Sequence, residues 1–125
     1  MENDKEKFKK EFKARIYKFV IRLVKFVDTL PKDTSSQIFA KQILRSGTSI
    51  GANYIEAQAS SSKKDFTNFF HHSLKSANET RFWIAVLRDT GKGEEKEACL
   101  LFAELTEIAN ILGSSILALK GKSKF

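Results

Sequence analysis

The stretch of sequence that decides the fold is Arg45-Ser46-Gly47-Thr48-Ser49-Ile50-Gly51-Ala52-Asn53-Tyr54-Ile55-Glu56. It has a helical rhythm, but polar side chains occupy positions that a bundle helix normally fills with apolar ones. Helical spacing places one polar set on a single face: Gln42, Arg45, Ser49, Ala52 and Glu56, with Asn53 beside them. A buried arginine is tolerated only when its charge is paired. The face therefore predicts a partner for Arg45 elsewhere in the chain.

The partner follows from folding residues 63–90 back on residues 34–59 about a turn near Ser61. In this antiparallel register Glu79 lies within one helical turn of Arg45. We therefore predict a buried Arg45–Glu79 pair between the second and third helices, with further hydrogen bonds from neighbouring polar side chains. The predicted structural polar network is Gln42, Arg45, Ser49, Asn53, Glu56 and Glu79. We interpret it as structural rather than catalytic.

Three short breaks divide the chain into four helical segments. The breaks are Leu30-Pro31, Ser60-Ser61-Ser62 and Gly91-Lys92-Gly93. The predicted helices span about residues 4–29, 34–59, 63–90 and 94–119, and no strand-like alternation competes with them. Long helices joined by short turns predict an all-α, antiparallel up-down-up-down four-helix bundle, formed as a single domain over residues 1–125.

The first and last helices carry more apolar surface than one bundle core needs. The first helix has a core seam of Phe12, Ile16, Phe19, Leu23, Phe26 and Leu30, and a second seam of Tyr17, Val20, Val24 and Val27 with Ile21 beside it. The last helix has Leu101, Leu105, Ile108 and Leu112 on one seam, and Phe102, Ala109 and Ile116 on another. This surplus predicts contact with other copies of the chain. The alternative is that both seams face neighbouring helices of the same bundle.

The formal net charge of +7 predicts an anionic partner such as nucleic acid. The charged stripe of the first helix contains no acid, and the candidate nucleic-acid-binding residues are Arg15, Lys18, Arg22, Lys25, Lys63 and Lys64. Their contacts are expected to be with phosphates. One alternative is a protein-interaction scaffold whose charge only keeps it soluble. Another is a membrane-surface protein, which we rank last because the bundle core already uses the apolar face of the first helix.

Several classes of chemistry lack their residues. Cys99 is the only cysteine, so no disulfide framework exists, and we expect it to be a small core residue in a reducing cytoplasm. The charged start has no signal-peptide pattern. His71 and His72 are adjacent and point apart on a helix, and no zinc spacing or phosphate loop is present. We expect no metal, no cofactor and no enzymatic activity.

A series of motifs resembles one bacterial family in order and spacing. The motifs are Leu30-Pro31, Gln42-Ile43-Leu44-Arg45-Ser46, Ser49-Ile50, Asn53-Tyr54-Ile55-Glu56-Ala57, Asp65-Phe66 and Ser76-Ala77-Asn78-Glu79. The family is that of the four-helix-bundle proteins encoded in intervening sequences of large-subunit ribosomal RNA genes, with the accessory variability proteins of diversity-generating retroelements. The resemblance covers about residues 12–119.

The resemblance implies a homopentamer of bundles that forms a ring with a basic surface. In the retroelement branch it also implies binding to nucleic acid and to a reverse transcriptase. We therefore expect a non-enzymatic oligomer that binds RNA or DNA, as an accessory to a reverse transcriptase or to rRNA.

Overall fold

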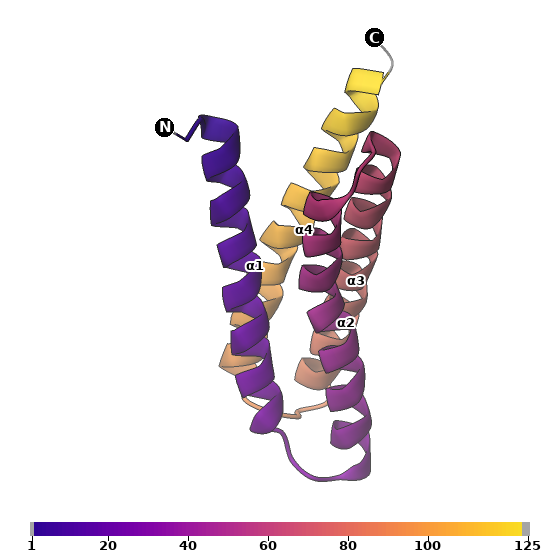
Figure 1. The fold of residues 1–125 in the computed structure, drawn as a ribbon. Coiled ribbons are helices and arrows are strands. Elements are labelled where there is room, and N and C mark those ends of the chain that lie inside the picture. The colour runs from indigo at the N-terminus through magenta and orange to yellow at the C-terminus, as the bar shows by residue number, and fades with distance from the viewer. Residues whose placement is uncertain (1, 124–125) are drawn as a thin grey trace.

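The computed structural model describes residues 2–123, which form four long helices and no strand. The helices are α1 (Asp4–Asp28), α2 (Thr34–Ala59), α3 (Lys63–Asp89) and α4 (Glu95–Ser123). Short connections join consecutive helices at alternate ends of the bundle (Figure 1). The described chain is therefore an all-α four-helix bundle. The prediction that the last helix stops near residue 119 is wrong, because one glycine costs a helix only about 1 kcal/mol and Gly121 stays helical.

Side-chain caps and two glycines explain where the helices begin and end. The Asp33 carboxylate accepts a hydrogen bond from the backbone N–H of Ser36 at 3.4 Å and caps α2. It also accepts from Nζ of Lys92 at 2.9 Å, which ties the α1–α2 connection to the α3–α4 connection and holds the pKa of Asp33 well below its usual range. Gly91 and Gly93 have φ of 72° and 75°, in the left-handed region that favours glycine after a helix.

The core is built from the seams that the apolar spacing predicts. The first seam of α1 is buried from Phe12 to Leu30, and Leu101, Leu105, Ile108 and Leu112 of α4 are fully buried. On the second seam of α1, Tyr17 is 67 % exposed, and Ile21 beside it is 40 % exposed.

The second seam of α4 behaves differently from that of α1. Ala109 and Ile116 are buried, and Phe102 packs against the core. The prediction that these α4 residues form surplus apolar surface is therefore wrong, since they face the helices of their own bundle. The surplus of apolar surface predicted for α1 is partly present, at Tyr17 and Ile21.

The segment Glu95–Gly121 of α4 is long and apolar enough to cross a membrane by length and composition, with a mean hydropathy of 1.4. Core helices of soluble proteins have the same properties. In the described chain α4 packs its leucine seam into the bundle, with Leu101 and Leu105 fully buried. One third of its most apolar stretch, 33 %, is buried in the bundle, so packing in the core accounts for part of the apolar composition of α4.

Two glycines of α2 differ in the space around them. A Cβ on Gly47 would overlap Cδ2 of the fully buried Leu23, whereas a Cβ on Gly51 would meet only Cγ2 of Ile16, at 3.5 Å. We expect Gly51→Ala to raise the free energy of unfolding by about 0.5–1 kcal/mol, because alanine favours the helix. We expect Gly47→Ala to lower it by about 1–3 kcal/mol through overpacking. Urea denaturation of both variants tests this, and shifts of the same sign would contradict it.

Candidate nucleic-acid interface

The two arginines of the predicted basic stripe already have carboxylate partners on α4. Arg15 donates from Nε and Nη2 to the two oxygens of Glu104, both at 2.7 Å, and its Nη2 lies 3.3 Å from Glu107. Arg22 donates in the same way to Glu97, also with both bonds at 2.7 Å. The stripe is therefore not a row of free cations. The acids that the stripe itself lacks come from the neighbouring helix.

These ion pairs shift the pKa values of their carboxylates. Hydrogen bonds from Arg15 lower the pKa of Glu104, and those from Arg22 lower the pKa of Glu97, both against the opposing effect of burial. A carboxylate with a lowered folded-state pKa stabilises the fold above its unfolded pKa. That stabilisation is lost as the pH falls through the folded-state value. The α1–α4 interface should therefore weaken in acid.

The sequence carries a signal for these pairs that our prediction missed. Arg15 and Arg22 are seven residues apart, as are Glu97 and Glu104, and the order is reversed between the helices. Antiparallel helices that pack along a heptad seam bring such pairs together. The antiparallel register of α1 and α4 therefore predicts these partners, as the register of α2 and α3 predicts a partner for Arg45.

The four lysines of the predicted set are exposed and make no ion pair within residues 2–123. Lys18 and Lys25 lie seven residues apart along α1, which is about 10 Å of helix. Lys63 and Lys64 lie in the first turn of α3, at the opposite end of the bundle from the α1–α2 connection (Figure 1). The structure therefore does not bring the predicted residues into one compact patch.

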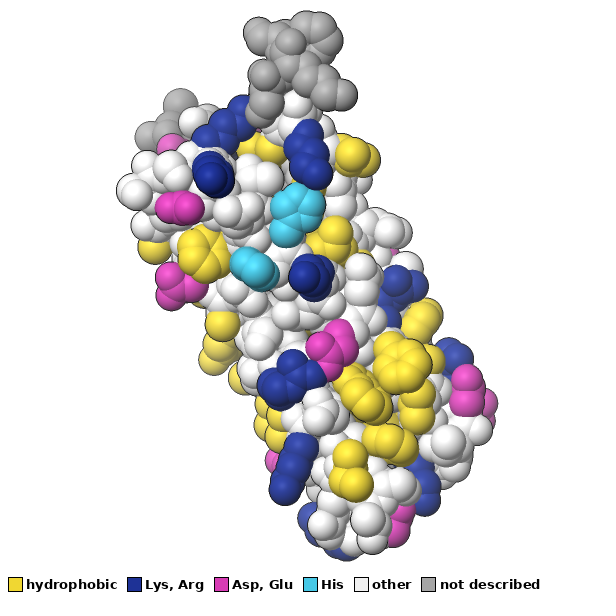
Figure 2. All heavy atoms as spheres, turned by 90° about the vertical axis from the view of Figure 1, so that its right-hand side faces the viewer, with side chains coloured by type: hydrophobic (Ala, Val, Ile, Leu, Met, Phe, Trp, Pro, Cys, Tyr) yellow, Lys and Arg dark blue, Asp and Glu magenta, His cyan; other side chains and the backbone are white. Residues whose placement is uncertain are grey.

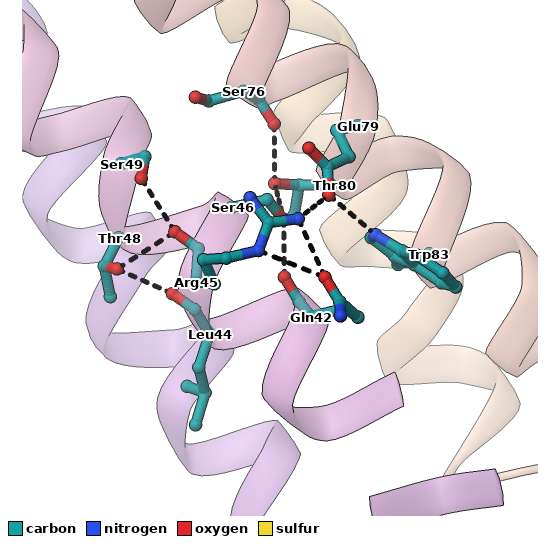
Figure 3. Close-up of polar contacts among 10 residues, drawn as sticks. All are labelled: Gln42, Leu44, Arg45, Ser46, Thr48, Ser49, Ser76, Glu79, Thr80 and Trp83. Carbon is teal, nitrogen blue, oxygen red and sulfur yellow. Dashed lines mark hydrogen bonds and ion pairs between the residues drawn. The ribbon is translucent and has the colours of Figure 1, made fainter. Parts of the chain in front are cut away.

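The predicted pair between Arg45 and Glu79 is present. Figure 3 shows the guanidinium of Arg45 between Oε2 of Glu79 and Oε1 of Gln42, which accepts from Nε at 3.1 Å and from Nη2 at 2.8 Å. Ser49 instead donates to the backbone carbonyl of Arg45 at 2.8 Å. Asn53 donates to the carbonyl of Ser49 at 2.9 Å and does not reach the guanidinium.

The expected burial of this pair is wrong. The side chains of Arg45 and Glu79 are 56 % and 38 % exposed. An exposed pair of this kind contributes about 0–1 kcal/mol, far less than a buried one. Sequence reasoning also missed Trp83, whose indole N–H donates to Glu79 at 3.0 Å and, more than Arg45, lowers the pKa of that carboxyl. Glu56 is exposed and has no hydrogen bond or ion pair within the described residues.

The buried polar contacts between α2 and α3 are made by hydroxyl groups. Ser73 donates to the carbonyl of Ile50 at 2.8 Å. Oγ1 of Thr80 lies 2.8 Å from Oγ of Ser46 and 2.7 Å from the carbonyl oxygen of Ser76. Ser46, Ser73 and Thr80 are almost completely buried. These small side chains let the two helices pack closely while satisfying their own polar atoms.

An apolar patch lies on the surface formed by α2 and α3. Ile38 and Phe82 are 52 % and 59 % exposed, and the ring of Trp83 lies 5.1 Å from that of Phe82 and 5.8 Å from that of Phe39. Figure 2 shows hydrophobic side chains gathered in the lower half of this side of the bundle, with basic and acidic side chains interspersed around them. This face has the composition of a protein contact rather than of a phosphate-binding surface.

A metal centre requires several ligating side chains held close together. No group of three or more His, Cys, Asp or Glu side chains within residues 2–123 could hold a metal ion. Cys99 is exposed on α4, so the expectation of a core cysteine is wrong. The helical phase explains this, because Cys99 lies between the buried residues Ala98 and Leu101 and points away from their face.

Comparison with known proteins identifies the family. The family model described as 23S rRNA-intervening sequence protein matches residues 9–114. This chain belongs to the 23S rRNA-intervening sequence protein family. A similar solved structure is a protein of unknown function of the S23 ribosomal protein family, from Bacteroides thetaiotaomicron. The two sequences are 37 % identical, the match covers 84 % of this chain and 97 % of that one, and the TM-score is 0.76. No curated protein matches the chain.

Membership of the 23S rRNA-intervening sequence protein family agrees with the structural role of the polar motif. Residues 9–114 include the paired Arg45 and Glu79 and both α1–α4 arginines. In each of these pairs the charged groups join two helices of the bundle. These charged groups therefore contribute to the packing of the bundle.

Proposed function

We propose that this protein is a non-enzymatic, oligomeric four-helix bundle that binds nucleic acid through its unpaired lysines. The observation that carries the proposal is that Lys18, Lys25, Lys63 and Lys64 are exposed and have no acidic partner in the described chain, whereas Arg15 and Arg22 do. The family description names 23S rRNA, which makes a structured RNA the first nucleic acid to test. Phosphate contacts of this kind are expected to be strongly salt-dependent and weakly selective for sequence.

Self-association is the second part of the proposal. The exposed apolar residues Ile38 and Phe82 on one side, and Ile21 and Leu100 elsewhere, support contacts between copies. Two different contact surfaces on one chain close into a ring when the rotation between copies allows it. We propose the pentamer that the family resemblance implies. Several copies would multiply a small set of lysines, so affinity would come from multivalency.

A reverse transcriptase is a further partner within this proposal. It rests on the resemblance to the accessory proteins of diversity-generating retroelements. A basic ring could hold the RNA template near such an enzyme through the same lysines. The proposed accessory role therefore depends on nucleic-acid binding being present.

A salt titration of RNA binding tests the proposal. The variant Lys18→Glu/Lys25→Glu/Lys63→Glu/Lys64→Glu is expected to bind rRNA about 100-fold more weakly than the wild type at low salt. The slope of log K against log salt should shrink by about 0.7–0.9 for each phosphate that the variant no longer neutralises. Sedimentation velocity of the same samples measures the number of subunits.

The matched control is Lys32→Glu/Lys41→Glu/Lys75→Glu/Lys96→Glu, which makes the same change in net charge at exposed lysines elsewhere. It should weaken binding by less than about ten-fold, since only long-range attraction is reduced. Equal losses in the two variants would show that bulk charge, not these lysines, attracts RNA. Absence of binding by the wild type at low salt would favour a protein-interaction scaffold.

A further inference from the structure

An apolar groove of about 550 Å³ runs between α1 and α2. Its floor includes the buried side chains of Ile16 and Tyr54. Tyr17 of α1 and Ile55 of α2 also line it, and they are 67 % and 45 % exposed. Exposed apolar side chains beside a groove of this size are typical of a site that is covered by a partner.

The groove exists because the residues along it are small. Ala14, Gly51 and Ala52 line it. A Cβ on Gly51 would be in ordinary contact with Ile16 at 3.5 Å, so close packing of α1 against α2 does not require a glycine there. Gly47, one turn earlier, has no such room because Leu23 fills the space. The groove therefore lies beside Gly51 and Ala52 of α2, and it does not extend to Gly47.

The charges along the groove are all positive. Lys10, Lys13 and Lys18 line it, and no carboxylate side chain is among the lining residues. Lys10 pairs with Glu2 at 2.5 Å, whereas Lys13 and Lys18 form no ion pair with any described residue. A partner that covers the apolar floor would gain most from acidic side chains at its edges.

We propose that this groove binds an amphipathic helix of a partner protein, with an apolar stripe flanked by acidic residues. The α2 side of the groove, from Thr48 to Ile55, is about 10 Å long, which matches helical anchors at positions i, i+3 or i+4, and i+7. Of the four lysines proposed to bind nucleic acid, Lys18 lines the groove, whereas Lys25, Lys63 and Lys64 lie outside it. The groove is therefore largely separate from the proposed nucleic-acid contacts.

Charge argues against the α2 face around Ile38 of a second copy as the occupant. On α2 of such a copy, the exposed Ile38 has Lys41 one turn away, which would meet the lysines of the groove. Glu97 and Glu104 of α4 are already bound to Arg22 and Arg15. A helix with free carboxylates beside its apolar stripe fits the groove better than this face does.

A peptide titration tests the proposal. The probes are a labelled helical peptide with leucines every third or fourth residue and glutamates on both flanks, and the same peptide with lysine in place of glutamate. Fluorescence anisotropy should show that the wild type binds the glutamate peptide at least about ten-fold more tightly. Ala52→Glu, which puts bulk and negative charge in the groove, should weaken that binding at least about ten-fold.

Gln58→Glu is the matched control, because it makes the same charge change at an exposed position of α2 outside the groove. It should leave peptide affinity within about two-fold, and circular dichroism should show both variants equally helical. Equal affinity for the two peptides, or equal losses in the two variants, would overturn the proposal.

Two further results would assign the groove to another occupant. Conversion of a wild-type oligomer to monomers by Ala52→Glu in sedimentation velocity would show that a second copy fills it. Loss of binding to phosphatidylglycerol vesicles in the same variant would show that a lipid surface does. RNA affinity is measured separately with the lysine variants, so failure of either proposal can be distinguished from failure of the other.

Discussion

Leu23→Ala is expected to lower the free energy of unfolding by about 2–5 kcal/mol. Leu23 is fully buried on α1, and its Cδ2 occupies the space that a side chain on Gly47 of α2 would need. Truncation removes apolar burial and leaves a cavity where α1 packs against α2. Because small proteins are stable by only about 5–15 kcal/mol, this loss should be visible directly in urea denaturation. The measurement is made at one protein concentration, since self-association raises apparent stability.

Coupling to Gly47 gives this prediction a second test. Gly47→Ala should destabilise the wild type but stabilise the Leu23→Ala variant, because the overlap with Cδ2 disappears and alanine favours the helix. Leu117→Ala, at a side chain that is 72 % exposed, is the control and should change stability by less than about 0.5 kcal/mol. Additive effects of the two core substitutions would contradict this packing of Leu23 against Gly47.

Arg15→Glu is expected to lower the free energy of unfolding by about 2–3 kcal/mol. Arg15 donates two bonds of 2.7 Å to Glu104 and lies near Glu107, and the Arg15 and Glu104 side chains are only 33 % and 28 % exposed. The substitution removes both bonds and places a third carboxylate between α1 and α4. Thermal and urea unfolding measure the loss.

The charge swap Arg15→Glu/Glu104→Arg separates pairing from packing. It should restore more than half of the lost stability, because opposite charges again face each other. Lys18→Glu, at an exposed neighbour without an ion pair, should cost less than about 0.5 kcal/mol. The single variant's deficit should also shrink in acid, where Glu104 becomes protonated. Equal deficits in the single and swapped variants would show that the ion pair does not hold α1 to α4.

Sequence reasoning located the Arg45–Glu79 pair because a tight turn sets the register of two antiparallel helices. The register does not fix how deeply the pair lies between the helices. Exposure depends on how far each helix rotates about its axis, and the small residues that meet between α2 and α3 are Ser46, Ser73 and Thr80. The pair consequently sits at the edge of the interface beside Trp83.

The sequence by itself determined the four helices and the apolar seam of α1, because capping, turns and helical periodicity act between residues close in the chain. Only the tertiary structure decided which charges remain free. The partners of Arg15 and Arg22 lie 89 and 75 residues away, so their neutralisation depends on how α4 packs against α1. It likewise decided that small side chains on two helices leave an open groove, since a void is a property of packed surfaces and not of either helix alone.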